Sequence, residues 1–178
     1  MLDSVDKKKS YIFSILGLAV LIAIDQISKY LAVTHLKDSD GIKLINGVFE
    51  LLYVENKGAA FGVMQGQQII LLIVTCIVLI AAIYIFTRIP ADKKYRIMKI
   101  LAVFIIAGAI GNMIDRVIYQ YVVDFFYFSL IDFPVFNVAD CYITVSVIIL
   151  FILIVFYYKE DELNFLFKKI DTDKETTK

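Results

Sequence analysis

The chain lacks most of the side chains on which metal-dependent and disulfide-rich proteins rely. It has one histidine, His35, and two cysteines, Cys76 and Cys141, among 178 residues. A zinc site usually needs several His, Cys or carboxylate ligands, and His35 stands outside any HExxH pattern. Both cysteines lie inside apolar runs, where a thiol usually behaves as a small, inert hydrophobic group. We therefore expect no metal, no cofactor and no disulfide framework.

An excess of charge of one sign is missing as well. The 18 Lys and Arg residues balance 18 Asp and Glu residues, so the formal net charge is zero. Such a chain has no basic surplus to attract nucleic acid. The sequence also has no GxSxG nucleophile elbow, and the adjacent residues Ser28 and Lys29 would point in different directions on a helix. Nucleic-acid binding and serine-based hydrolysis are thus disfavoured.

Apolar residues, in contrast, make up 60% of the chain. Soluble domains contain about 45–50%, so this chain has more apolar surface than one soluble core can bury. Four runs are long enough to cross a hydrocarbon core of about 30 Å, and they must do so as helices because an isolated strand cannot satisfy its backbone in lipid. We predict a membrane all-α fold: one integral membrane domain, residues 1–178, built as a four-helix transmembrane bundle. The spans are expected at about 11–33, 69–86, 97–115 and 140–158.

The distribution of basic residues predicts the orientation of this bundle. Thirteen of the 18 Lys and Arg residues lie before the first run, between the second and third runs or in the first turn of the third, or after the fourth. Under the positive-inside rule these segments face the cytoplasm. Both termini are then cytoplasmic, including the tail at 159–178, and residues 34–68 and 116–138 face outward. We expect the mixed-charge tail from Glu160 onward to be solvated.

Both outer segments carry signs of local structure. In the first, Asn46-Gly47 stands between two apolar stretches and favours a type I′ hairpin turn, so we expect a small β-hairpin or sheet on the outer membrane surface. The second is dense in aromatic residues, which suit a membrane interface, and is expected to include a short loop helix. Its two acids are Asp124, in apolar surroundings that should raise its pKa, and Asp132, in a looser and more solvated stretch.

Polar residues within or beside the spans are the most informative ones, because each is costly in lipid unless it is paired or faces water. Asp25 and Lys29 are four residues apart on one helix face and can pair, either as an anchor at the interface or as part of a site. Asn112, Asp115 and Arg116 also share one face, either as polar contacts between helices or as a shell around a site.

These residues all fall near the outward ends of the spans, which suggests one polar site beneath the outer surface. Asp140, at the start of the fourth span, can be accounted for as a helix cap, whereas Asp124 cannot. If the two lie close together, they cannot both ionise readily and would share a proton, as the carboxylates of an aspartic protease do. One carboxylate can then activate a water while the other polarises a carbonyl.

Five blocks of the sequence resemble, in order, the signature blocks of the lipoprotein signal peptidase (signal peptidase II) family. They read DQISK at 25–29, NKGAAF at 56–61, GNMIDR at 111–116, VVDF at 122–125 and FNVAD at 136–140. The resemblance extends from about Tyr11 to Tyr158. It implies a metal-independent aspartyl endopeptidase of the bacterial cytoplasmic membrane, which cleaves prolipoproteins just before a diacylglyceryl-modified cysteine and is inhibited by globomycin.

The resemblance also implies roles for individual residues. Asp124 and Asp140 match the catalytic pair. The residues that would position or support the substrate and this pair are Asn56, Gly58, Asn112, Arg116, Asn137, Asp25, Lys29 and Asp115. One departure is visible at Gln120, where family members often have glycine, so we expect an altered loop between Arg116 and Asp124.

The implied partners are the lipid-modified substrate and membrane lipid, and the implied state is a monomer with its site at the outer leaflet. Two other interpretations stay open on the residues alone. A small proton- or ion-coupled transporter also places Asp, Asn and Lys within the membrane, although this chain shows no internal repeat. A non-enzymatic scaffold that uses polar residues between helices would tolerate Asp124→Asn, whereas a peptidase would not.

Overall fold

The computed structural model describes residues 2–58 and 66–166 and consists mainly of helices. Within these residues the α-helices are α1 (Leu2–Leu36), α2 (Gln68–Arg88), α3 (Arg96–Tyr119) and α4 (Val138–Phe156). The strands are β1 (Ile42–Ile45), β2 (Phe49–Asn56) and β3 (Val122–Tyr127), and the 3₁₀ turns are η2 (Lys93–Tyr95), η3 (Ser129–Ile131) and η4 (Glu160–Leu166). All four α-helices are long and apolar enough to cross a membrane. The predicted four-helix membrane fold is confirmed.

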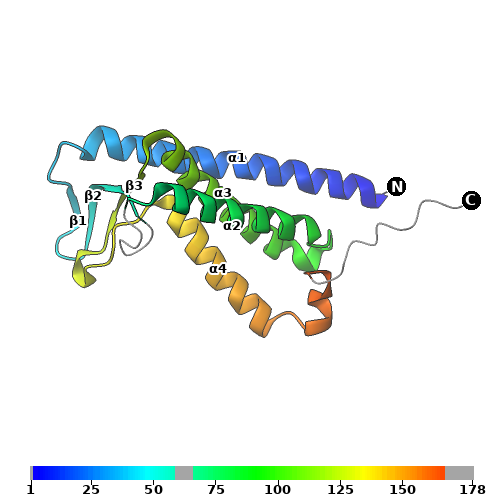
Figure 1. Ribbon diagram of the computed structural model, residues 1–178. Helices are drawn as coiled ribbons and strands as arrows, with labels where there is room; N and C mark the ends of the chain where they lie inside the picture. Colours follow the sequence, from blue (N-terminus) through cyan, green and yellow to red (C-terminus); the bar gives the residue numbers. More distant parts are fainter. Residues whose placement is uncertain (1, 59–65, 167–178) are drawn as a thin grey trace, which may run out of the picture.

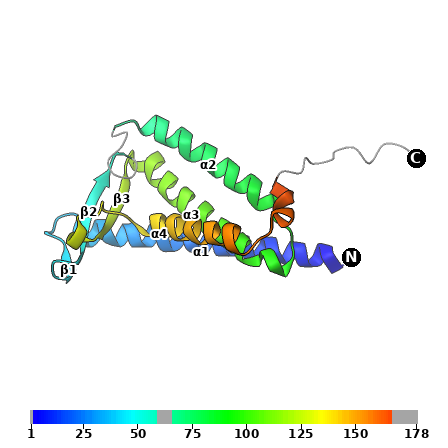
Figure 2. The same ribbon diagram turned by 90° about the horizontal axis from the view of Figure 1, so that it is seen from below.

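Helix α3 lies at the centre of the bundle. It packs against α1, α2 and α4, which surround it in Figures 1 and 2. Its buried positions run from Met98 to Asp115. Helices α2 and α4 instead expose large apolar side chains along most of their length. Such helices suit a lipid environment, because they are apolar on nearly every side.

Two glycines on α3 allow its neighbours to approach closely. A Cβ atom at Gly108 would meet the backbone oxygen of Ala139 on α4 at 2.5 Å, and a Cβ atom at Gly111 would collide with the carboxylate of Asp25 on α1. Small residues at such crossings let helix backbones come together. They bring the start of α4 and the middle of α1 onto the same part of α3.

The helices lead at one end to a three-stranded antiparallel sheet in the order β1-β2-β3, which we call the sheet end (Figure 1). The predicted hairpin between β1 and β2 forms, but its turn is not type I′. That turn needs a positive φ at both central residues, and here only Gly47, at +70°, has one, whereas Asn46 does not. Because Ile45 pairs with Phe49, the connection has three residues, and a single glycine in the left-handed region is enough to close it.

The second outer segment contains a strand that the sequence did not predict. The first four residues of β3, from Val122 to Phe125, are all buried. A strand buried on both faces lacks the alternation of apolar and polar residues by which strands are predicted. The short loop helix expected in this segment is η3.

Gln120, where related sequences often have glycine, lies at the end of α3. This residue caps the helix in the left-handed conformation, with φ +64°, and its N–H donates to the Arg116 carbonyl at 3.2 Å. Glycine reaches this region without a steric penalty, so a glycine suits the position, and glutamine occupies it with some strain. Helix α3 therefore runs beyond the predicted span, and the loop before β3 is a short helix cap.

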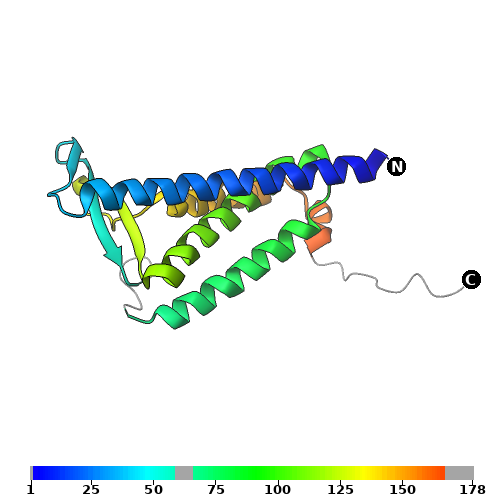
Figure 3. The same ribbon diagram turned by 90° about the horizontal axis from the view of Figure 1, so that it is seen from above.

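The far end of the bundle, opposite the sheet, holds the start of α1 and the turn η4 (Figures 1 and 3). Arg88 donates to the Phe165 carbonyl at 3.1 Å, and the Tyr95 ring stacks on Tyr158 with centroids 5.4 Å apart. Residues 160–166 of the tail form η4, which contacts the connection between α2 and α3 but has no buried residue, so the solvated tail stays a prediction. The rest of that tail, residues 167–178, lies outside the described residues.

Candidate active site

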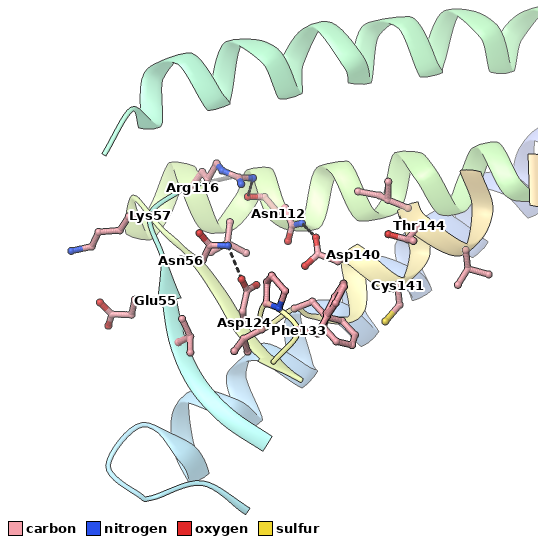
Figure 4. A pocket seen from close by; sticks show the side chains of 17 residues that line it. Glu55, Asn56, Lys57, Asn112, Arg116, Asp124, Phe133, Asp140, Cys141 and Thr144 are labelled. Carbon is pink, nitrogen blue, oxygen red and sulfur yellow. Dashed lines mark hydrogen bonds between the residues drawn. The ribbon is translucent and has the colours of Figure 1, made fainter. Parts of the chain in front are cut away.

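Asp124 and Asp140 reach one cavity from two neighbouring elements. Asp124 lies in β3, and Asp140 lies in the first turn of α4. Both line a cavity of about 860 Å³, and Figure 4 shows their side chains directed into it. Apolar side chains such as Phe133 and Val145 form much of its wall. The structure thus brings together the two acids that the sequence predicts to act as a pair.

Both carboxylate oxygens of Asp124 receive hydrogen bonds from asparagine amides. Asn137 donates to Oδ1 at 2.6 Å and Asn56 donates to Oδ2 at 2.8 Å. Burial, followed by the charge of Asp140, raises the pKa of Asp124 to about 7, although the two amide donors act in the opposite direction. The direction agrees with the prediction from the apolar residues on either side of Asp124.

Asp140 is held by the start of its own helix. Its Oδ2 accepts the backbone N–H of Asn137 at 3.1 Å, and the Asn137 side chain accepts the backbone N–H of Asp140 at 3.0 Å. This reciprocal arrangement is a capping box. The other oxygen, Oδ1, accepts the side-chain amide of Asn112 at 2.8 Å. Asp140 therefore takes part in capping its helix and also faces the cavity.

Asn137 fixes both acids at once. It is fully buried, its side-chain oxygen caps α4, and its amide reaches Asp124. The same amide also lies 3.1 Å from the side-chain oxygen of Asn112. A side chain with several partners has little rotational freedom, so it holds the position of one acid relative to the other.

A buried ion cluster lies behind the two acids. Lys29 is 3% exposed, and its Nζ lies 3.0 Å from a carboxylate oxygen of Asp25 and 3.0 Å from one of Asp115. Its third contact is the side-chain oxygen of Asn112, at 2.9 Å. An ammonium group has three protons, and here each has an acceptor. The i, i+4 pairing of Asp25 with Lys29 is confirmed, in a buried position instead of at an exposed interface.

The ion cluster also holds the backbone directly in front of each acid of the cavity. Asp25 accepts the N–H of Ala139 at 3.0 Å, and Ala139 precedes Asp140. Asp115 accepts the N–H of Val123 at 3.1 Å, and Val123 precedes Asp124. The cluster therefore positions the acids through the main chain.

Gln26 completes this cluster and was not singled out from the sequence. Its amide donates to Asp25 and to Asp115, each at 3.1 Å, and to the Gly111 carbonyl at 3.2 Å. The only sequence signal for this role was its place inside the DQISK block. A glutamine next to an acid has no distinctive sequence spacing from which hydrogen bonds to two acids could be predicted.

Asn56 and Arg116 line the cavity on the side of β2, and Gly58 contacts both of them. The backbone N–H of Gly58 donates to the Asn56 side chain at 2.9 Å, which orients the amide that reaches Asp124. Arg116 lies 3.4 Å from the Gly58 carbonyl and 3.4 Å from the Asn112 carbonyl. Lys57 points away from the two acids (Figure 4). The rest of the NKGAAF block, residues 59–61, lies outside the described residues.

The apolar wall of the cavity was not predicted residue by residue. It includes residues 133–136 from the aromatic outer segment, together with Cys141, Ile143 and Thr144 from α4. Apolar residues are common throughout this chain, so no motif marks the few that line a site. Asp132, the other acid of this segment, instead accepts the Tyr127 hydroxyl at 2.6 Å, on the surface.

The site combines two carboxylates with neutral donors. Across the described residues, the ion pairs join Lys29, Lys37 and Lys94 to other acids, and none involves Asp124 or Asp140. The same residues contain no group of three or more His, Cys, Asp or Glu side chains placed to hold a metal ion. Arg116 lines the same cavity and interacts with both acids through its charge, without an ion-pair contact. Two carboxylates in one cavity with no ion-paired cation are suited to holding a single proton.

The chain is similar to solved bacterial membrane enzymes over most of its length. One, solved by the in meso method at 2.3 Å resolution, aligns with a TM-score of 0.74 and 32% identity, covering 89% of this chain and 94% of that one. Another, solved by the same method at 1.9 Å, aligns with a TM-score of 0.69 and 33% identity, covering 82% of this chain and 94% of that one. Together with the spans and the polar cavity, these likenesses define a multi-pass membrane enzyme.

Sequence relatives narrow this class. The lipoprotein signal peptidase of Streptococcus pyogenes serotype M1 is 39% identical over 148 residues, which cover 83% of this chain and 94% of that protein. The protein of the same name from serotype M5 (strain Manfredo) matches to the same extent. The family model described as Signal peptidase (SPase) II matches residues 17–156. The chain belongs to the signal peptidase II family, and it is a membrane peptidase.

Proposed function

We propose that this chain removes the signal peptide of prolipoproteins by cleavage just before a diacylglyceryl-modified cysteine, with Asp124 and Asp140 as the catalytic pair. One observation carries the proposal. Both carboxylates line a single cavity, and their four oxygens accept hydrogen bonds from N–H groups of Asn56, Asn112 and Asn137. Neutral donors orient the carboxylates and leave one of them able to stay protonated. A directly bound cation would instead favour ionisation of both.

The proposed reaction uses one proton shared by the pair. The ionised carboxylate takes a proton from a water, which attacks the carbonyl carbon of the scissile peptide bond. The protonated carboxyl donates to the carbonyl oxygen while negative charge develops there. The first carboxyl then returns a proton to the leaving nitrogen. Because the two groups interact, the proton belongs to the pair and not to one aspartate.

The position of the site suits a substrate that lies in the membrane. The cavity extends along α4 to Thr144 and Val145, so a signal-peptide helix approaching from the lipid can bring its cleavage site to the acids. The positive-inside rule supports a cytoplasmic position for the far end, where most basic residues lie, with the sheet end outside. We therefore infer a site at the outer leaflet of the bacterial cytoplasmic membrane, with both termini inside.

The test is a cleavage assay with the purified full chain in detergent and a prolipoprotein carrying the diacylglyceryl cysteine. Mass spectrometry of the products identifies the bond that breaks. Asp124→Asn and Asp140→Asn should each abolish cleavage while the protein stays folded, because an amide can neither take nor return the proton. Globomycin should inhibit the unchanged protein.

Asp132→Asn is the matched control. It makes the same change in the same outer segment, at an exposed acid whose carboxylate accepts the Tyr127 hydroxyl and does not line the cavity. Its activity should stay within a few-fold of the unchanged chain. Full activity in either dyad variant, or loss of activity on adding a metal chelator, would overturn the two-aspartate mechanism. Cleavage at another bond would overturn the proposed substrate class instead.

A further inference from the structure

A second cavity lies at the far end of the molecule, away from both acids. It has a volume of about 710 Å³ and is formed between the first half of α1, the residues around η2 and the first half of α3. None of its lining residues belongs to the candidate active site. Its size is within the usual range for a ligand-binding cavity.

The lining changes from charged to apolar along the helices. Arg96, Lys99 and Val103 follow one another at i, i+3 and i+7 on one face of α3, so they are successive positions along the cavity. The distance from Arg96 to Val103 along the helix axis is about 10 Å. On α1, Ser10 lies at the charged end and Leu21 at the apolar end. The cavity therefore has a polar mouth and an apolar interior.

The polar mouth carries a positive charge. Lys93, Arg96 and Lys99 contribute to it, against a single carboxylate, Asp92. The ion pairs found within residues 2–58 and 66–166 use neither Lys93 nor Arg96. Lys99 also lies over the Tyr11 ring, 5.9 Å from its centroid. An anionic group is the complement of this end.

The apolar part of the cavity has room at Gly17. A Cβ atom added there would meet nothing within 4 Å, in contrast to Gly108 and Gly111 on α3, where it would collide. Phe13 and Val20, on the same side of α1, are 73% and 58% exposed. An apolar chain lying along Gly17 would cover these side chains.

We propose that this cavity binds an anionic phospholipid of the cytoplasmic leaflet, with its phosphate beside Lys93 and Arg96 and one acyl chain along Gly17. A free phosphate would match only the charged mouth, and a zwitterionic lipid would lack the net negative charge. Basic pockets between membrane helices on the cytoplasmic side are suited to anionic lipid headgroups. The proposal rests on the orientation inferred above and does not require that the chain cleave prolipoproteins.

The test uses the purified full chain in detergent, titrated with phosphatidylglycerol or with phosphatidylcholine of the same acyl composition. Native mass spectrometry counts the lipid bound to each chain. We expect saturable binding of one phosphatidylglycerol, at least about tenfold tighter than that of phosphatidylcholine. The double variant K93Q/R96Q should weaken it by about 30-fold, since each basic residue near an anionic lipid is worth about a factor of five.

Two further variants separate the headgroup from the acyl chain. Lys159→Gln removes an exposed charge at the same end of the molecule, outside the cavity, and should leave binding unchanged. Gly17→Leu keeps every charge but fills the acyl space, and it should reduce phosphatidylglycerol binding at least tenfold. An unchanged thermal transition shows that each variant is folded.

Three outcomes would overturn the proposal. Equal affinity for phosphatidylcholine would show that the charge is not recognised, and unchanged binding in K93Q/R96Q would place the lipid elsewhere. Displacement of the lipid by excess inorganic phosphate would show that the cavity binds simple anions and does not recognise the acyl chain. Because lipid is counted directly, none of these results depends on whether the chain cleaves a prolipoprotein.

Discussion

Two pairs of carboxylates lie within one network, and among the described residues one pair has a cation between its members whereas the other has none in ion-pair contact. Asp25 and Asp115 flank Lys29, which lies 3.0 Å from each. Within the described part of the chain, the side-chain oxygens of Asp124 and Asp140 accept N–H groups of asparagines and form no ion pair. The residue type is the same in both pairs, so the partner decides the role. A lysine compensates two charges and produces a fixed support, whereas amides leave a pair that can carry a proton.

The two pairs are joined by their positions along the chain. Each acid of the ion cluster binds the main-chain N–H of the residue immediately before one acid of the cavity. Asn112 adds a side-chain link, since it accepts from Lys29 and donates to Asp140. A substitution in the ion cluster should therefore mainly affect folding, and one in the cavity should mainly affect chemistry.

The largest expected effect separates these two roles. Asp124→Asn should lower the rate of prolipoprotein cleavage by about 10⁴-fold or more, as removal of a catalytic group commonly does, without lowering thermal stability at pH 8. Asp115→Asn should instead lower stability, because it leaves Lys29 in the protein interior with one acid fewer. Cleavage assays and thermal unfolding of both variants measure the contrast. If Asp124→Asn unfolds the protein, the distinction between the pairs is wrong.

The next largest effect is expected at the cation itself. Lys29→Met should reduce the free energy of unfolding by about 3–5 kcal/mol, because it leaves Asp25 and Asp115 buried without their counter-charge. Lys37→Met is the matched control, since Lys37 forms an exposed pair with Glu55 at 3.3 Å and should matter by less than about 1 kcal/mol. Denaturant titration in detergent compares the two. Equal effects would mean that burial of the cluster contributes nothing.

The pH profile tests the proton held by the cavity pair. Because the pKa of Asp124 is raised to about 7, the shared proton is lost as the pH rises through that value. Cleavage should then fall about tenfold for each further pH unit. The free energy of unfolding should also fall as the pH rises. The carboxyl of the unfolded chain releases its proton near its usual pKa of about 4, whereas the folded protein keeps the proton up to about pH 7. The fold therefore loses stability between about pH 4 and pH 7, and this loss does not continue above pH 7.

Asp124→Asn should remove that part of the pH dependence of stability, whereas Asp132→Asn should leave it in place. Thermal unfolding of the three proteins between pH 4 and pH 9 would show the difference. A cleavage rate that rises steadily from pH 7 to pH 9 would contradict the proton-sharing pair.

The smallest effect is expected outside both pairs, at Gln120. Replacing it by glycine should stabilise the protein by about 0.5–1 kcal/mol, since glycine adopts the φ of +64° without a steric penalty. Cleavage should not change, because Gln120 does not line the cavity. A loss of stability would show that the glutamine side chain contributes more than its backbone conformation costs.

The sequence predicted the helices well because membrane spans have a strong signal. An uninterrupted apolar run of about 20 residues matches the thickness of a bilayer and seldom occurs in a soluble protein. Strand β3 had no such signal, because its buried residues show no alternation. The turn at Gly47 was misjudged because one glycine can serve a two-residue or a three-residue hairpin.

The residues of the candidate site were predicted from residue types and sequence blocks, but the contacts of each residue within the site were not. The spacing of Asn112 and Asp115 places both on one face of α3, but Asn112 reaches Asp140 whereas Asp115 turns to Lys29. Helical spacing predicts which face of a helix a side chain lies on. It does not predict which neighbouring side chain it contacts there. Such choices depend on the packing of α1 and α4 around α3.

The composition of the cavity wall has a consequence for how this protein can change over generations. Asn137 and Asn112, two of the asparagines that hold the acids, also cap α4 and contact the ion cluster respectively, so replacing either disturbs folding as well as chemistry. Phe133 and Val135 line the same cavity from a loop. Selection for a different signal-peptide sequence, or for escape from a compound lodged beside the acids, would meet the least resistance at these two positions.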